Sequence, residues 1–272
     1  MKNTTILKII NIVAFVLVLV ANWGANTEFV PNTVGDLGES RAIFFLPAGY
    51  VFAIWGVIYS GLLAYVIYQA VPSKRENGVV EKIGWWFVIN CVANISWLIL
   101  FVYNQIWLST VAMLVLLLSL VVITRNLGVG KSNVSWAERL AVHVPFSIYL
   151  GWISVATVAN FSTALFDNGF VTSFLGIDAA LWASVMMVVA SVLAFAMLYF
   201  RRDIAYALVI VWATYGINAR SFETDLYSVV SSLDAGLVNT TALAIAVIVG
   251  IGAVIALGAT VLRGQQASVA VS

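Results

Sequence analysis

The sequence predicts an all-α integral membrane protein with eight membrane-spanning helices, and three observations lead to this prediction. Apolar residues make up 62% of the 272 residues and charged residues only 9%, whereas soluble domains contain about 25% charged residues. Eight stretches approach the roughly 20 consecutive apolar residues that a helix needs to cross a bilayer. The basic residues between these stretches fall almost entirely on one side of the predicted membrane.

The eight predicted spans are joined by short polar connections, and none shows the alternation of a transmembrane strand. They are Ile6–Trp23, Tyr50–Gln69, Ile83–Tyr103, Ile106–Thr124, Leu140–Ser162, Ala179–Tyr199, Ile204–Ile217 and Leu237–Leu262. The first span is interpreted as a membrane helix rather than a cleaved signal peptide, because its apolar stretch is longer than a signal peptide's core. The seventh is short and is expected to extend toward Arg220.

The distribution of charge supports this order of spans. With the N-terminus in the cytoplasm, only Arg41 and Arg220 of the 13 Lys and Arg residues fall outside, whereas most of the 12 acidic residues do. The cytoplasmic basic residues are Lys2, Lys8, Lys74, Arg75, Lys82, Arg125, Lys131, Arg139, Arg201, Arg202 and Arg263. Because basic residues favour the cytoplasmic side, we expect a multi-pass protein of a bacterial plasma membrane with both termini cytoplasmic.

Composition excludes several classes of protein. A formal net charge of +1 indicates no nucleic-acid partner. The single cysteine, Cys91, excludes an internal disulfide and cysteine-based metal sites, and the single histidine, His143, excludes a bis-histidine haem. The central part of each span lacks Asp, Glu, Lys and Arg, which argues against a proton pump, an ion-coupled transporter and a voltage-gated channel. We therefore predict no metal site and no catalytic side chains.

Three spans carry aromatic and uncharged polar residues on one helical face. Trp55, Trp97 and Trp152 lie inside their spans and in the outer half of the membrane, whereas tryptophan usually lies at the interfaces. The three faces are Phe52, Trp55 and Tyr59; Asn90, Asn94, Trp97 and Phe101; and Pro145, Tyr149, Trp152, Ala156 and Asn160, with Thr157 beside the last. Since an amide facing lipid would be unsatisfied, these faces should point inward. They are either packing faces joined by hydrogen bonds or the walls of a pocket for a flat ligand.

These residues also form motifs. The segment Pro47–Tyr59 resembles the second-helix signature of the TspO/translocator-protein family, the tryptophan-rich sensory proteins. Asn94–Phe101 resembles the family's third-helix N-x-x-W-x-x-x-F, and Trp152–Asn160 is similar to its fifth-helix W-x-x-x-[AT]-T-x-x-N. The resemblance covers residues 1–165. It implies a five-helix TspO-like bundle, to which residues 166–272 add three transmembrane helices (about 179–199, 204–219 and 237–262).

The resemblance also implies a ligand site. Members of the family bind porphyrins, haem and sterol-like ligands in a cavity, and several are dimers. By resemblance, the cavity would be lined by Phe52, Trp55, Tyr59, Asn94, Trp97, Phe101, Tyr149, Trp152, Ala156, Thr157 and Asn160, with the loop Gly24–Leu46 as its lid. The chain departs from the family's pattern in two spacings. Phe52 is one residue closer to Trp55 than in the family, and Pro145 is one helical turn further from Trp152. No Tyr followed by a basic residue comes after Asn160, which argues against sterol binding.

The leading functional prediction is a membrane receptor or sensor that binds a planar hydrophobic ligand: porphyrin, haem or a related tetrapyrrole. Its partners would be membrane lipid and this hydrophobic small molecule, with no obligatory cofactor. One alternative is a transporter or permease with its path between the five-helix unit and the added helices. Another is a light-dependent porphyrin-degrading enzyme acting through Trp55 and Trp152. Any catalysis would come from the ligand itself, so we favour a binding protein over an enzyme.

Several features carry simpler interpretations. His143 is expected to bond locally rather than to ligate haem, and Cys91 is expected to be a packing residue. Small residues repeat in the last span and in the sixth, which favours close packing within the molecule; a homodimer seam is the alternative. They are Gly252, Ala256, Gly258 and Thr260, and Ala180, Ser184, Ala190 and Ala194. The amphipathic segment Ser221–Gly236 predicts a short helix on the outer membrane surface.

Overall fold

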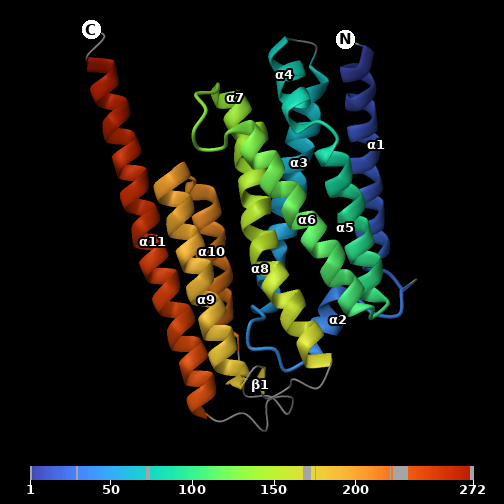
Figure 1. Ribbon diagram of the computed structural model, residues 1–272, viewed down its shortest axis with the longest axis vertical. Helices are drawn as coiled ribbons and strands as arrows, with labels where there is room; N and C mark the ends of the chain where they lie inside the picture. The colour runs from blue at the N-terminus through green and yellow to red at the C-terminus, as the bar shows by residue number, and fades with distance from the viewer. Residues whose placement is uncertain are drawn as a thin grey trace.

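The computed structural model describes residues 2–28, 30–71, 74–167, 173–174, 176–220, 222 and 232–269. Within these ranges the chain is almost entirely helical, and the long helices run side by side along the longest axis of the molecule (Figure 1). Six helices are long and apolar enough to cross a membrane, and two further apolar helices are shorter. Together they account for the eight predicted spans and confirm the all-α membrane fold.

The helices follow the predicted order. The long ones are α1 (Lys2–Gly24), α3 (Ile54–Ala70), α5 (Trp86–Val102), α6 (Ile106–Leu127), α8 (Val144–Asp167), α9 (Ala179–Ala196), α10 (Ile204–Asn218) and α11 (Ser232–Val269). A 3-10 turn, η1 (Gly49–Ala53), leads into α3. The short helix α7 (Trp136–Glu138) and the π turn η2 (Arg139–His143) lead into α8, and a second π turn, η3 (Met197–Arg201), follows α9. The remaining elements are α2 (Val34–Glu39), α4 (Lys74–Ile83) and the antiparallel pair β1 (Ser173–Phe174) and β2 (Ile177–Asp178).

Among the predicted span boundaries that differ from the structure, two differ for clear local reasons. The third span begins at Trp86 rather than Ile83, because Gly84 adopts a φ of +56° and separates the polar helix α4 from α5. The fifth begins at Trp136 rather than Leu140, where the side chain of Ser135 caps the helix. The helix then widens into η2 just before Pro145, which has no N–H to donate to a regular turn.

Most of the predicted surface helix Ser221–Gly236 lies outside the described residues, so this helix stays a prediction. Its last residues, from Ser232 onward, are the first turns of α11, which is therefore longer than the predicted span. Phe222 is buried, and its ring lies 5.3 Å from that of Phe44. The rest of the segment lies outside the described residues.

Polar side chains cap the helices that begin near the membrane surface. The carboxylate of Asp178 accepts a hydrogen bond from a backbone N–H in the first turn of α9, and Asp203 does the same for α10. Thr33 and Asp36 form a reciprocal capping box on α2. Hydrogen bonds from Thr33 lower the pKa of the Asp36 carboxyl below its ordinary value, which favours the charged form that caps α2.

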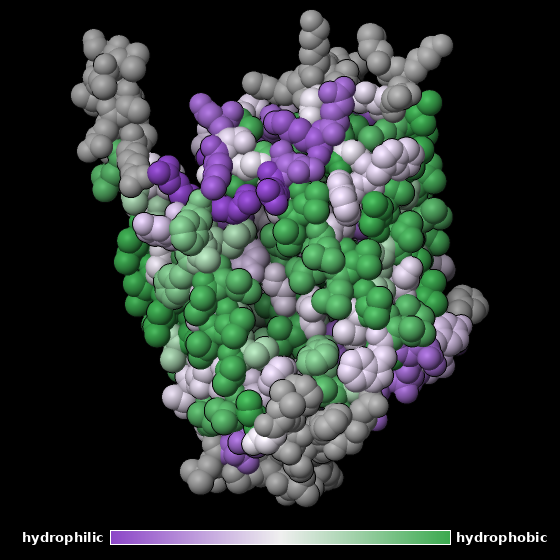
Figure 2. Space-filling model, viewed as in Figure 1, coloured by the Kyte–Doolittle hydropathy of each residue, from purple (hydrophilic) through white to green (hydrophobic). Residues whose placement is uncertain are grey.

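The helices pack as a group of five and a group of three that meet along α8. Helix α5 packs against α1 and α6, and α8 packs against α6, α3 and α10, while α9, α10 and α11 contact one another. On the face shown in Figure 2, hydrophobic residues cover the middle of the molecule, and hydrophilic residues gather at the end where Figure 1 places α4 and α7. The division of the chain at residue 165 into two domains stays a prediction.

The small-residue face of α9, and Gly252 of the face on α11, pack inside the molecule. Ala180, Ser184, Ala190 and Ala194 of α9 are all buried. A Cβ atom on Gly252 of α11 would lie 2.7 Å from the ring of Phe195, so this glycine permits α11 to approach α9 closely. The α9 face and Gly252 therefore serve intramolecular packing, whereas Gly258 and Thr260 of α11 are exposed. The homodimer stays a prediction.

Candidate functional site

Helices α3 and α5 bring a ladder of aromatic rings together near the α2 end of the five-helix group. The indole of Trp55 on α3 stacks on Tyr59, with ring centroids 5.4 Å apart, and on Trp97 of α5, at 5.9 Å. Trp97 continues the ladder to Phe101 at 5.7 Å. The inward faces predicted for these helices therefore meet, and their ring planes are nearly parallel at Trp55.

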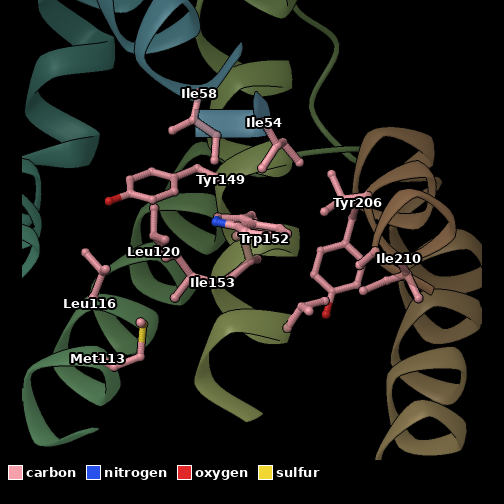
Figure 3. Packing of buried hydrophobic residues seen from close by; sticks show 14 of the residues in the cluster. Ile54, Ile58, Met113, Leu116, Leu120, Tyr149, Trp152, Ile153, Tyr206 and Ile210 are labelled. Carbon is pink, nitrogen blue, oxygen red and sulfur yellow. The ribbon is translucent and has the colours of Figure 1, made fainter. Parts of the chain in front are cut away.

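Trp152 of α8 closes this cluster from the other side. Its ring meets Phe52 and Trp55 edge to face, at centroid distances of 5.6 and 6.3 Å. Only 2% of Trp152 is exposed, and it packs in the core with residues such as Tyr149 (Figure 3). Its indole nitrogen has no hydrogen-bond partner among the described residues. A buried N–H without a partner costs free energy, so this donor is a site of unsatisfied hydrogen bonding beside the cluster.

A cavity of about 460 Å³ lies against the ladder. It is lined by aromatic and apolar residues of α3 and α5, by polar residues of α1 and the lid loop, and by a residue just after α10. Its lining residues are Asn22, Asn26, Thr33, Val34, Gly35, Gly38, Leu46, Pro47, Gly49, Phe52, Trp55, Tyr59, Trp97, Leu98 and Arg220. Arg220 is the one charged residue among them.

A smaller cavity of about 50 Å³ adjoins the first and shares its aromatic wall. The shared residues are Val34, Gly38, Leu46, Pro47, Phe52, Trp55 and Trp97. Its other lining residues are Phe101, Met113, Trp152, Val155, Ala156, Ala159, Asn160 and Thr163. Because the same side chains wall both spaces, the two cavities form a single candidate site divided by the rings of Trp55 and Trp97.

The predicted lid loop does cover the cavity. Helix α2 and the residues after it supply several lining residues, including Val34 and Leu46. The Arg41 guanidinium, 6% exposed, pairs with both carboxylate oxygens of Asp167 at the end of α8, at 2.6 and 2.8 Å. It also donates to Asn104 at 2.6 Å and to the Leu37 carbonyl at 2.8 Å. These contacts, called the Arg41 latch below, fix the lid to α8 and to the α5–α6 turn.

The buried amides connect helices. Asn94 of α5 accepts a hydrogen bond from Asn22 of α1 at 3.1 Å and donates one to the Tyr149 hydroxyl of α8 at 3.0 Å. The Asn160 carbonyl accepts from the Trp97 indole at 2.9 Å, and its amide nitrogen donates to Thr110 at 2.7 Å. Both asparagines are therefore engaged by the protein itself, as the packing interpretation of the faces requires.

Eight of the predicted site residues line the two cavities: Phe52, Trp55, Tyr59, Trp97, Phe101, Trp152, Ala156 and Asn160. Asn94, Tyr149 and Thr157 line neither. The Tyr149 ring meets Trp55 edge to face, and its hydroxyl accepts the hydrogen bond from Asn94. The Thr157 hydroxyl donates to the backbone carbonyl of Ile153, which places it against its own helix.

Asn90, which shares the predicted inward face of α5, bonds elsewhere. Its amide donates to the Ser119 hydroxyl of α6 at 2.8 Å, so it ties two helices together outside the cavities. The predicted inward face of α5 is therefore buried along its length, but only Trp97 and Phe101 of this face line the cavities.

His143 and Cys91 do not belong to the site. The His143 imidazole is buried in η2, with Nε2 3.7 Å from the Glu138 carboxylate, and it lines neither cavity. Cys91 is buried in the hydrophobic core. The packing interpretation of Cys91 fits this position.

The sequence motifs miss the residues that lie outside the three aromatic spans. Asn22, Asn26 and Thr33 enter the site from α1 and the lid, and Arg220 enters from the end of α10. One signal could have found two of the important charges. In the sequence-based topology Arg41 and Arg220 are the two basic residues on the external side, which basic residues avoid. Arg220 lines the larger cavity, and Arg41 ties the loop that lines it to α8.

Comparison with known proteins gives one family. A search of curated proteins and a search of solved structures returned no match. The sequence model of the family described as TSPO-like protein matches residues 8–255. The match runs through the first five spans and on into α11, so it includes the three added helices. The chain is therefore a multi-pass membrane protein that belongs to the TSPO-like protein family.

Proposed function

We propose that this protein binds a planar hydrophobic ligand of the porphyrin class in the aromatic cavity of its first five helices and acts as a membrane receptor or sensor for it. The observation that carries the proposal is the stacked ladder of Trp55, Trp97 and Tyr59 along one wall of a lidded cavity. The family expectation for the ligand class agrees with this geometry.

The physical chemistry of the cavity suits such a ligand. Its volume of about 460 Å³ falls within the 300–1,000 Å³ range typical of small-molecule sites. Broad, nearly parallel indole rings favour offset stacking with another flat aromatic system. The Trp152 N–H beneath this wall has no protein partner in the described residues, and a ring nitrogen or a polar substituent could accept its hydrogen.

The cavity favours recognition of the organic ring rather than of an iron atom. The lining residues include neither His nor Cys, and the single histidine lies in η2, apart from both cavities. Haem would therefore be held here through its ring, and a metal-free tetrapyrrole would meet the same contacts.

The binding test compares two tryptophans. The purified full chain is titrated with protoporphyrin while tryptophan emission is recorded, using the parent protein, Trp55→Leu and Trp107→Leu. Trp107 lies on α6, is 46% exposed and lines neither cavity, so it is a matched control. We expect saturable quenching whose dissociation constant rises about tenfold in Trp55→Leu, a loss of about 1.4 kcal/mol, and is unchanged in Trp107→Leu.

Equal effects of the two substitutions would contradict the proposal, because they would mean that the porphyrin partitions into detergent or lipid. Quenching without saturation in the parent protein would contradict it as well.

A further inference from the structure

At the end of the bundle away from the cavities, the loop between α6 and α7 meets the turn between η3 and α10. Gly130 of the loop has a φ of +77°, and a Cβ atom there would lie 1.6 Å from the backbone carbonyl oxygen of Arg201. Only glycine permits this approach. The loop belongs to the five-helix group and the turn to the three-helix group, so the contact joins the two groups at the end where α7 lies (Figure 1).

Two basic side chains flank this contact. Lys131 directly follows Gly130, Arg202 directly follows Arg201, and both basic residues are exposed. Arg202 has a φ of +53° and ends η3, so the chain turns sharply there before α10. Because both side chains are long and start beside one backbone contact, they can reach the same small anion. Lys131 and Arg202 are called the basic pair below.

The nearest acidic residue along the chain does not neutralise the basic pair. Asp203 is only 4% exposed, and its carboxylate accepts hydrogen bonds from the Ser147 hydroxyl of α8 and from the backbone N–H of Tyr206. Arg201 supplies the positive charge that interacts with this carboxylate. Within the described residues, the basic pair itself forms no ion pair. The surface beside the contact therefore carries uncompensated positive charge.

Exposed aromatic rings lie next to this charge. Tyr199 and Phe200 belong to η3, both are exposed, and their ring centroids lie 5.0 Å apart in an edge-to-face arrangement. Aromatic side chains concentrate where a bilayer meets water, and basic groups at that level attract anionic lipid headgroups. Positive charge beside exposed apolar surface matches a molecule whose anionic group is joined to hydrocarbon.

We propose that Lys131 and Arg202 bind the phosphate of an anionic phospholipid. The phosphate oxygens would accept charge-assisted hydrogen bonds from both side chains, and the acyl chains would lie along the exposed apolar side of α9. The lipid would thereby bridge the five-helix and three-helix groups. This site lies at the opposite end of the molecule from the aromatic cavity, so the inference does not depend on the proposed function.

The test compares headgroups and positions of charge. The delipidated full chain is titrated in detergent with phosphatidylglycerol or with phosphatidylcholine of the same acyl chains, and bound lipid is counted by native mass spectrometry. The proteins are the parent, the double variant Lys131→Gln with Arg202→Gln, and the double variant Lys2→Gln with Lys8→Gln. Lys2 and Lys8 lie on α1, which packs against α3, α4 and α5, so the second variant loses the same charge elsewhere.

We expect the parent to bind phosphatidylglycerol about tenfold more tightly than phosphatidylcholine, equivalent to about 1.4 kcal/mol. The basic-pair variant should lose this preference, and the α1 variant should keep it. Raising the salt concentration should reduce the preference, because salt screens exposed charges. Phosphatidylglycerol should also raise the melting temperature of the parent more than that of the basic-pair variant, because a ligand of the folded state stabilises it.

A separate titration distinguishes a lipid from a free anion. Inorganic phosphate at the concentration of the lipid should not displace phosphatidylglycerol, because it has no acyl chains to contact α9. Displacement at that concentration would overturn the assignment to a lipid. The inference would also fail if the parent showed no preference between the lipids, if the basic-pair variant kept the preference, or if both double variants lost it equally. Binding of phosphatidylcholine by each preparation checks that the variants are folded.

Discussion

Buried amides determine how the helices around the site are held together. In hydrocarbon an unpaired amide has no water to satisfy it, so each must find a partner in the protein. Asn94 has two, Asn22 on α1 and Tyr149 on α8, and it is only 1% exposed. Asn94 therefore connects α1, α5 and α8 and does not line the cavity.

Asn94→Leu should therefore lower stability more than affinity. Removing the amide leaves the Asn22 side chain and the Tyr149 hydroxyl each without one partner, and an unsatisfied buried group costs about 1–3 kcal/mol. We expect a lower melting temperature in the absence of ligand and a nearly unchanged dissociation constant for protoporphyrin. Asn126→Leu, at an exposed position at the other end of the molecule, is the control. A normal melting temperature combined with weakened binding would instead place Asn94 in the ligand site.

The lid is held by one buried arginine. Helix α2 is only six residues long, which is too short to be stable by itself in water. Its capping box and the Arg41 latch supply the missing stabilisation, and the latch reaches α8 and the α5–α6 turn. Opening the cavity therefore requires separation of Arg41 from Asp167.

Breaking the latch should accelerate ligand exchange. Asp167→Asn weakens the ion pair and leaves the Arg41 charge buried without its counter-ion, which is destabilising. We expect the protoporphyrin dissociation rate to rise about tenfold, equivalent to 1.4 kcal/mol, and proteolysis within residues 24–46 to become faster. Stopped-flow fluorescence measures the dissociation rate, and timed digestion measures the rate of proteolysis.

The double variant Arg41→Gln with Asp167→Asn sharpens this test. Because it also removes the stranded charge, it should be no less stable than Asp167→Asn alone. Arg125→Gln serves as the control. Unchanged dissociation and digestion in every latch variant would show that the lid moves independently of Arg41.

At the scale of the whole molecule, α1 begins and α11 ends at the same end of the bundle, on opposite sides of it (Figure 1). Helices α4 and α7 also lie at this end. Eight crossings return the chain to its starting side, and the basic residues gather at this end in the sequence-based topology. The site lies at the opposite end, under α2.

The positive-inside rule predicts that the end of the bundle with the basic residues faces the cytoplasm. A reporter fused after Ser272 should be cytoplasmic, and one inserted near Asn168 should be external. Paired reporters, one active only in the cytoplasm and one only outside it, provide the measurement. An external C-terminus would contradict the orientation and would place the candidate cavity on the cytoplasmic side.

The sequence alone determined the class of fold and most of the aromatic wall. Length and hydropathy specify helices because a bilayer leaves a spanning backbone no other way to satisfy its hydrogen bonds without closing a barrel. Helical periodicity then determined which side chains share a face, so that Trp55, Trp97 and Trp152 could be assigned to one interior from their spacing. Periodicity assigns a residue to a face, but it does not show whether that face meets a cavity or another side chain.

Only the tertiary structure decided whether each face meets a cavity or another side chain. Asn94 and Tyr149 share their faces with Trp97 and Trp152, yet they bond each other and line neither cavity. The roles of Arg41 and Arg220 also required it, because their partners lie 126 and 174 residues away in the sequence. Contacts across such separations depend on how the helices pack, and helical periodicity carries information only about neighbours within a few turns.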